Sequence, residues 1–236
     1  WYHSPLMYRN LIILLLPALL FSCGGDTTKV NDGEKDASKG ASVTDRATPP
    51  TETIEVDIED TKRTEWQNPD LILDRIGDLE NKSVADIGAG SGYFTFKIAR
   101  RAAKVIALDI DPKALDYIES QKEIVGEWSN NIEVRLTPPD VPNLLEEEVD
   151  LVLIVNTYNY IPNKEVYFPR LLDGMKPGAR LVIVDFKKGE IPIGPADEYK
   201  VEASEIKSFL RKISFRKINI DEESLQYQYI ITAEKK

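Results

Sequence analysis

The chain has 236 residues and a formal net charge of −10, which suits one buried domain with extensions. Nucleic-acid binding needs a clustered basic surface, so the acidic balance argues against a nucleic-acid partner. The single histidine, His3, and the single cysteine, Cys23, both precede the segment expected to fold. Without them that segment has no ligands for a Cys/His zinc site, no Ser-His-Asp triad and no disulfide, and we expect no metal site in it.

The N-terminal region has the pattern of an export signal. Residues 11–21, LIILLLPALLF, form an apolar run after Arg9 that is too short to cross a hydrocarbon core of about 30 Å as a helix. Such a run is typical of a signal-peptide core. The segment LFSC that ends at Cys23 resembles the lipobox of bacterial lipoproteins, in which the cysteine becomes lipidated after cleavage. An ordinary export signal followed by an unmodified cysteine is the alternative. We predict a signal peptide over 1–22, with Met7 as the start and Cys23 as the lipidation site.

Residues 24–61 are rich in Gly, Asp, Ser, Thr, Lys and Pro and hold almost no large apolar residues. Such a composition buries too little surface to order itself. We therefore predict a lipidated cysteine and flexible linker over 23–61, followed by a folded domain over 62–236. The expected location is the bacterial cell envelope, in the periplasm or at the outer membrane, with membrane contact through the lipid anchor only.

After residue 65 the apolar residues alternate between helical and strand spacing. Helical spacing at 66–77 precedes a strand at 83–88, a helix at 94–101, a strand at 104–109 and a helix opened by Pro112. Further strands are predicted at 131–136, 149–156 and 180–186, helices at 164–175 and 202–211, and an antiparallel strand at 226–235. This alternation predicts an α/β fold with a mostly parallel sheet covered by helices on both faces.

The segment VADIGAGSGYF, residues 84–94, places Gly88, Gly90 and Gly92 directly after a predicted strand. Glycines let the backbone approach a ligand, and this turn lies where doubly wound sheets bind ligands. Asp109 ends the next strand, where a carboxylate accepts both hydroxyls of a ribose. The pattern predicts a ligand that contains adenosine. Tyr93 stands where a dinucleotide fingerprint has its third glycine, so a nucleotide-dependent oxidoreductase is the weaker alternative.

Four segments in this order resemble the motifs of class I S-adenosylmethionine-dependent methyltransferases: residues 84–94, 105–112, 149–161 and 175–186. The resemblance runs from about residue 65 to the end of the chain. It implies a Rossmann-like fold, doubly wound, with a mostly parallel seven-stranded sheet, helices on both faces and an antiparallel last strand. It also implies S-adenosylmethionine as the methyl donor and a small molecule as the acceptor.

The resemblance assigns contacts with the methyl donor to seven residues: Asp86, Gly88, Gly90, Gly92, Asp109, Asp140 and Asn156. Asp86 is expected to bind the amino group of the methionine part, and the glycines to contact the same part through their backbone. Asp109 is expected at the ribose. Asp140 is expected near the adenine amino group, with a simple loop aspartate as the alternative. Asn156 is expected to face both donor and acceptor.

Methyl transfer from a sulfonium needs alignment and exclusion of water, whereas a hydroxyl or ammonium acceptor must also lose a proton to a base. Similar members of this fold often carry a histidine pair where this chain has Asn159 and Tyr160, so the obvious base is missing. Tyr158, Tyr160 and Asp185 remain as catalytic candidates. The alternatives are that the tyrosines pack and Asp185 caps a turn, and that the protein is a non-catalytic binding module.

Residues 186–200, FKKGEIPIGPADEYK, form an irregular insertion between a predicted strand and the last helix. Loops at this place shape the acceptor side of such folds. Lys187, Lys188 and Lys200 are candidates for recognising an acidic small molecule, and a solvated charge cluster is the alternative.

Overall fold

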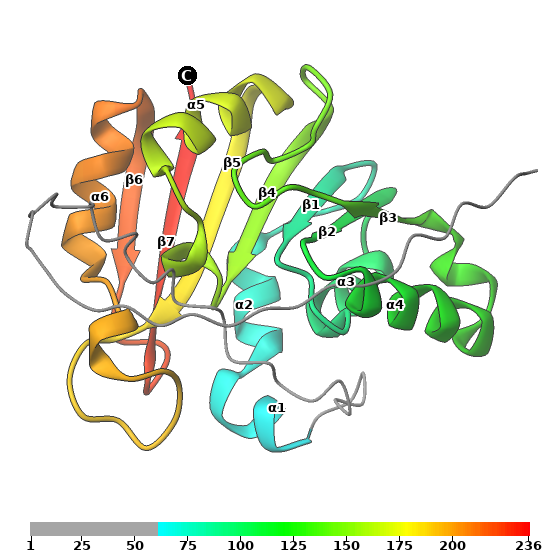
Figure 1. The fold of residues 1–236 in the computed structure, drawn as a ribbon, viewed down its shortest axis with the longest axis horizontal. Helices are drawn as coiled ribbons and strands as arrows, with labels where there is room; N and C mark the ends of the chain where they lie inside the picture. Colours follow the sequence, from blue (N-terminus) through cyan, green and yellow to red (C-terminus); the bar gives the residue numbers. More distant parts are fainter. Residues whose placement is uncertain (1–60) are drawn as a thin grey trace, which may run out of the picture. The chain divides into compact units, whose positions relative to one another are not determined.

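The computed structural model describes residues 61–236, so the predicted signal peptide, Cys23 and all but the last residue of the predicted linker lie outside the described residues. The described part is built on one seven-stranded sheet, with strand order β3-β2-β1-β4-β5-β7-β6 (Figure 1). Only β7 runs antiparallel to its neighbours, β5 and β6. The sheet confirms the predicted fold class.

The strands are β1 (Ser83–Ile87), β2 (Lys104–Asp109), β3 (Ile132–Leu136), β4 (Val149–Val155), β5 (Met175–Phe186), β6 (Phe215–Asp221) and β7 (Gln228–Lys235). The α-helices are α1 (Thr61–Gln67), α2 (Pro69–Ile76), α3 (Tyr93–Ala99), α4 (Pro112–Val125), α5 (Lys164–Gly174) and α6 (Ala203–Lys212). None of these described helices is both long and apolar enough to cross a membrane.

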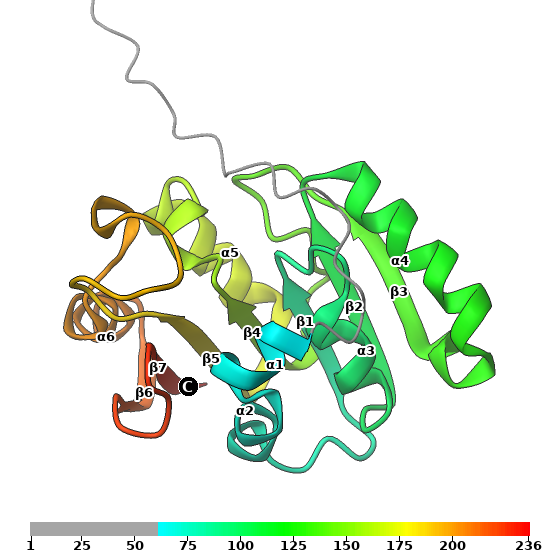
Figure 2. The ribbon, with the colours of Figure 1, turned by 90° about the horizontal axis from the view of Figure 1, so that it is seen from below.

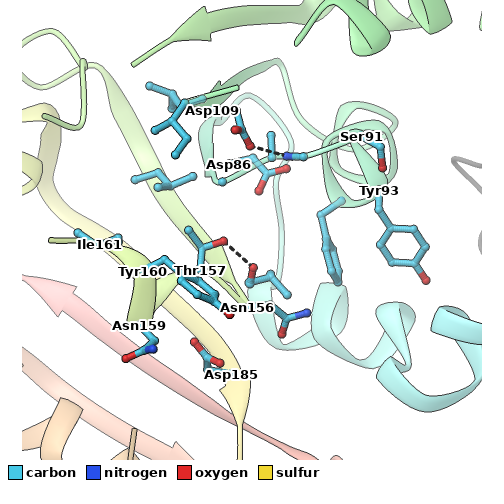
Figure 3. A pocket seen from close by; sticks show the side chains of 18 of the residues that line it. Asp86, Ser91, Tyr93, Asp109, Asn156, Thr157, Asn159, Tyr160, Ile161 and Asp185 are labelled. Carbon is cyan, nitrogen blue, oxygen red and sulfur yellow. Dashed lines mark hydrogen bonds between the residues drawn. The ribbon is translucent and has the colours of Figure 1, made fainter. Parts of the chain in front are cut away.

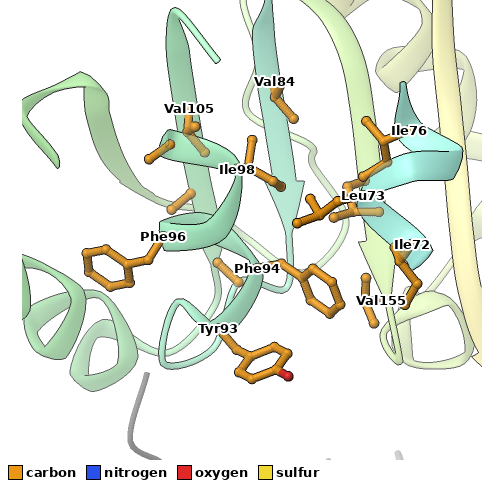
Figure 4. Close-up of a cluster of buried hydrophobic side chains, with 14 of the residues drawn as sticks. Ile72, Leu73, Ile76, Val84, Tyr93, Phe94, Phe96, Ile98, Val105 and Val155 are labelled. Atoms are coloured by element: carbon orange, nitrogen blue, oxygen red, sulfur yellow. The ribbon is translucent and has the colours of Figure 1, made fainter. Parts of the chain in front are cut away.

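Helices cover both faces of the sheet because successive side chains on its buried strands point to opposite sides. Val84 on β1 belongs to the cluster formed with α2, α3 and α4, whereas its neighbour Ala85 belongs to the cluster formed with α5 and α6. Figure 2 shows the two helical layers on either side of the strands, and Figure 4 shows the first cluster. The central strands are thus buried on both faces, as their continuous apolar runs predict.

The order of the strands fixes where a ligand can bind. From β1 the chain proceeds outward to β2 and β3, and it then returns to β4 on the other side of β1. In doubly wound sheets the reversal leaves a crevice at the carboxyl ends of the two central strands. The ends of β1 and β4 are therefore the place to look for a site.

Three local features differ from the predicted elements. Strand β5, predicted at 180–186, begins at Met175. The helical segment expected over 66–77 is two helices, because Asn68 adopts a left-handed conformation (φ 49°) and its side chain caps α2 by accepting from the Leu71 N–H. Strand β6 was not among the predicted segments. It is an edge strand in which only Phe215 is buried, and its register is irregular between Arg216 and Asn219, so it lacks a clear apolar pattern.

Candidate functional site

A cavity of about 600 Å³ lies at the carboxyl ends of β1, β2, β4 and β5 (Figure 3). We distinguish two parts of its wall. The β1–β2 half is defined by Asp86, Gly88, Gly90, Asp109 and Thr137. The β4–β5 half is defined by Asn156, Asn159, Tyr160, Asp185 and Phe186. The volume suits a ligand of cofactor size.

The turn after β1 is hydrogen-bonded to β2 and packs against the segment after β4. The backbone N–H groups of Gly88 and Ala89 donate to the carbonyl oxygen of Leu108, at 2.8 and 3.1 Å. Gly88 has φ +73°, and a Cβ built there would lie 2.3 Å from Oγ1 of Thr157, in the segment after β4. The turn therefore packs too closely against that segment for any side chain at position 88.

The other two glycines of the motif differ in what surrounds them. A Cβ at Gly90 would meet no atom within 4 Å, and Gly90 lines the cavity, so its backbone faces open space. Gly92 caps α3, where a Cβ would lie 2.8 Å from the Phe96 ring, and it does not line the cavity. The structure thus brings Gly88 and Gly90 to the cavity wall and places Gly92 in the packing behind it.

Asp109 is held in place by the turn that it faces. Its Oδ2 accepts from the Gly90 N–H at 2.8 Å, and its Oδ1 accepts from the Asp111 N–H at 2.9 Å. Figure 3 shows the first of these contacts closing the turn beside the cavity. Each carboxylate oxygen has a second lone pair, so a ligand hydroxyl can still donate to it.

Asp86, at the end of β1, is a buried carboxylate. Burial raises its pKa to about 6, while the hydroxyl of Thr95, which donates to Oδ2 at 2.7 Å, and the positive charge of Arg63 act in the opposite direction. Near neutral pH the group remains mostly ionised in a poorly solvated place. An ammonium group from a ligand would stabilise it there.

Asn156 enters the cavity wall from the end of β4 with φ 57°, a conformation that asparagine tolerates better than most residues. Its side-chain oxygen accepts from Nε2 of Gln228 on β7. The side-chain oxygen of Gln228 accepts in turn from Nε2 of Gln67 on α1, at 3.0 Å. Both glutamines are fully buried, so this amide chain fixes Asn156 from behind.

Asp185, at the end of β5, lies in the cavity wall and is 7% exposed. Burial raises its pKa to about 6, against the opposing effect of the backbone N–H groups of Phe186 and Tyr158 and the charge of Lys164. The Phe186 N–H donates to Oδ1 at 2.8 Å. In the view of Figure 3 Asp185 lies between Asn159 and Asn156, with Tyr160 beside it.

Besides Gly92, two predicted site residues are not brought to the cavity wall. Tyr158 is buried against Phe168, with ring centroids 5.6 Å apart, and burial raises the pKa of its phenol, so it is a packing residue. Asp140 is exposed, and only the preceding Thr137, Pro138 and Pro139 line the cavity. The prolines turn the chain so that Asp140 lies beyond the wall.

Two of the three lysines of the insertion have structural roles that the sequence did not suggest. Lys200 is buried, and its ammonium donates to the Gly189 carbonyl oxygen at 2.7 Å and lies 3.6 Å from Asp197. Lys187 donates to the carbonyl oxygens of Leu225 and Gln226. Neither is part of a solvated cluster or lines the cavity, and Lys188 is exposed.

Helix α1 supplies cavity residues that the sequence analysis missed. Lys62, Arg63 and Trp66 all line the cavity. The Arg63 guanidinium lies 4.3 Å from the centroid of the Tyr93 ring, and the Trp66 and Phe186 rings lie 5.6 Å apart. These residues directly follow the polar segment 24–61, where no regular spacing of residues predicts a role in the site. Within residues 61–236 no group of three or more Asp, Glu, His or Cys is arranged to hold a metal ion.

The middle of the described part matches a known family. Residues 85–181 match the model described as a methyltransferase domain. The chain is 31% identical over 111 residues to a demethylmenaquinone methyltransferase of Tropheryma whipplei, covering 47% of this chain and 44% of that protein. It is 26% identical over 132 residues to a tRNA U34 carboxymethyltransferase of Desulfotalea psychrophila, covering 55% of this chain and 39% of that protein. The chain thus spans less than half of these curated relatives.

Solved structures share the fold over most of the described part. A SAM-dependent methyltransferase from Aquifex aeolicus superposes with a TM-score of 0.69 at 24% identity, over 75% of this chain and 94% of that one. The arrangement of strands is therefore that of a methyltransferase fold, in agreement with the sequence prediction.

Proposed function

We propose that this protein is an S-adenosylmethionine-dependent methyltransferase that acts on a small-molecule acceptor. The observation that carries the proposal is the hydrogen-bonded unit of the glycine turn and Asp109 on the wall of a cofactor-sized cavity. This unit lies within the segment that matches the methyltransferase domain.

The residues of the β1–β2 half fit the chemical groups of this methyl donor. Asp86 would hold the ammonium of the methionine part, and the open face of Gly90 gives that part room to approach the backbone. Asp109 would accept the ribose hydroxyls, and Ile110 and Pro138 offer apolar surface for the adenine ring. When bound, the sulfonium would supply an already activated methyl group, so the protein has mainly to align the acceptor and exclude water.

Isothermal titration of the 236-residue chain with S-adenosylmethionine tests the proposal. We expect binding, a loss of affinity of at least about tenfold in Asp109→Ala, and little change in Asp116→Ala, an exposed aspartate on α4. Absence of binding at millimolar concentration would refute the proposal, and tight binding of a nicotinamide dinucleotide instead would favour an oxidoreductase. Binding without methyl transfer to any acceptor would identify the non-catalytic module that the missing histidine pair suggests.

We further propose that Cys23 carries a lipid anchor and attaches the protein to the bacterial cell envelope, in the periplasm or at the outer membrane. The support is the apolar run followed by LFSC. Metabolic labelling with a fatty acid is expected to mark the wild-type chain and to leave Cys23→Ala unmarked. Equal labelling of both would contradict the anchor.

A further inference from the structure

Asp185 is a buried carboxylate that makes no ion pair among the described residues. Its partners are the backbone N–H groups of Phe186 and Tyr158. The nearby Lys164 does not pair with it, because the Lys164 ammonium donates to the carbonyl oxygens of Ile161 and Asn159, at 2.7 and 3.3 Å. A buried anion with so little compensation is costly, and a positively charged ligand group would relieve that cost.

The surroundings of Asp185 suit a cation rather than an anion. Besides Tyr93 and Phe94 of the glycine motif, aromatic side chains line this cavity from five separate segments: Trp66, Tyr160, Tyr167, Phe186 and Tyr199. Ring faces attract ammonium groups. The only lysine or arginine side chains among the described lining residues are Lys62 and Arg63, both on α1, and Arg63 already stacks on Tyr93. An acidic acceptor would therefore meet Asp185 without a basic partner from the β4–β5 half.

The position of Asp185 separates it from the groups assigned to the methyl donor. In the strand order β2-β1-β4-β5, β5, which carries Asp185, is two places from β1, which carries Asp86. Two inter-strand spacings amount to about 10 Å. Asp86 and Asp109 remain available for the donor's ammonium and ribose, so Asp185 is free to serve the other substrate.

We propose that the methyl acceptor is an amine, bound as its ammonium form by the Asp185 carboxylate within this aromatic part of the cavity. The inference rests on the proposed function and specifies its substrate class.

The transfer needs only the Asp185 carboxylate as the base and S-adenosylmethionine as the methyl donor. The ammonium passes one proton to the Asp185 carboxylate, which frees the nitrogen lone pair. The nitrogen then forms a bond to the methyl carbon while the carbon–sulfur bond breaks and its electron pair stays on sulfur. The products are the methylated ammonium and S-adenosylhomocysteine, and the proton leaves Asp185 for water. A carboxylate whose pKa lies near 6 is mostly ionised at pH 7.5, as this step requires.

The chemical class of the acceptor can be determined before the acceptor itself is identified. The 236-residue chain is incubated with S-adenosyl-[methyl-³H]methionine and a deproteinised bacterial extract, and the labelled products are separated by charge at pH 7. We expect the label in the cationic fraction. In Asp185→Asn, which keeps the side-chain shape, the labelled product should fall at least about tenfold while the affinity for S-adenosylmethionine changes less than about twofold. Asp116→Asn, which makes the same charge change on the exposed face of α4, should match the wild type.

A second readout does not depend on turnover. With S-adenosylhomocysteine present, 2-phenylethylamine should raise the melting temperature of the wild type more than its neutral counterpart 2-phenylethanol does, and this difference should vanish in Asp185→Asn. Label in neutral or anionic products, no label despite bound donor, or no preference for the amine would each overturn the inference. Failure to bind the methyl donor would instead refute the proposed function.

Discussion

In the β1–β2 half of the cavity the two carboxylates accept from the turn and helix that follow β1 and from the turn after β2, whereas in the β4–β5 half Asp185 accepts from its neighbour Phe186 and from Tyr158, in the segment after β4. Asp86 is bound by Thr95 and Asp109 by Gly90 and Asp111, partners 9, 19 and 2 positions away in the sequence. The β4–β5 half depends on distant segments, such as Gln67, which is 161 positions from its partner Gln228.

The difference indicates that the two halves of the cavity have different roles. The hydrogen bonds of Asp86 and Asp109 hold the β1–β2 half in place before a ligand binds. This lowers the entropy cost of binding a ligand that is the same in every reaction. The β4–β5 half combines α1, the segment after β4 and the insertion after β5, all of which can vary without changing the sheet. Experiments that perturb one half and leave the other intact can test this division.

The largest effect is expected from Gly88→Ala. The new Cβ would lie 2.3 Å from Thr157 Oγ1 at a residue with φ +73°, so we expect a loss of about 3 kcal/mol or more in unfolding free energy, and loss of methyl-donor binding. Urea denaturation measures the unfolding free energy, and titration calorimetry measures the binding of the methyl donor.

Gly90→Ala is the matched control for Gly88→Ala, because its Cβ meets open space and only the positive φ costs energy, about 1 kcal/mol. Adding Thr157→Gly to Gly88→Ala should restore part of the lost stability. Equal destabilisation by the two single variants would show that the turn is not packed as described.

The next effect concerns Asp185 and pH. Because its folded pKa is raised from 3.8 to about 6, the folded state binds the extra proton between these values, and this group's contribution to stability falls as pH rises through that window. In Asp185→Asn this decrease in stability with rising pH should be absent. The variant should be close to wild type in unfolding free energy at pH 4 and more stable by about 2–3 kcal/mol at pH 7.5. Denaturant titrations at both pH values measure this.

Asp116→Asn serves again as the control for the pH experiment, since the same substitution on the exposed face of α4 should give no pH-dependent gain. A stability difference between Asp185→Asn and the wild type that stays constant with pH would mean that the carboxylate is not destabilised by burial.

A smaller, local effect is expected from Lys200→Met. Its ammonium holds the insertion through the Gly189 carbonyl and Asp197, so we expect a loss of about 1–2 kcal/mol and faster amide hydrogen exchange over residues 187–200. The exposed Lys188→Met should stay within about 0.5 kcal/mol of the wild type. Methyl-donor affinity should be the same in both, and a drop in Lys200→Met would show that the two halves are coupled.

The smallest effect is expected from Asp140→Ala. The side chain is exposed and outside the cavity wall, so affinity for S-adenosylmethionine should change by less than about twofold. A tenfold loss in calorimetry would instead support the adenine contact implied by the family resemblance.

The sequence predicted the parts of the site that depend on local geometry. Gly88, Gly90 and Asp109 follow directly from strand ends, and the hydrogen bonds between the two turns join neighbouring strands. The alternating apolar runs likewise predicted the two-faced burial of the central sheet.

The remaining features depend on contacts that no local pattern reveals. The buried state of Lys200 follows from the path of an irregular loop, and the displacement of Asp140 follows from the consecutive prolines before it. The role of Trp66 requires knowing that α1 packs against Phe186 at the end of β5. Such arrangements are set by tertiary packing and carry no period in the sequence.

The amide chain from Gln67 through Gln228 to Asn156 has a consequence for where this domain can be cut. It joins the first described helix, the last strand and the turn after β4 in one buried network. The segment that matches the family model, residues 85–181, contains Asn156 but neither glutamine. A shortened version limited to that segment would leave the Asn156 amide unpartnered and one sheet edge uncovered. The smallest unit expected to fold with an intact binding wall therefore runs from α1 to β7.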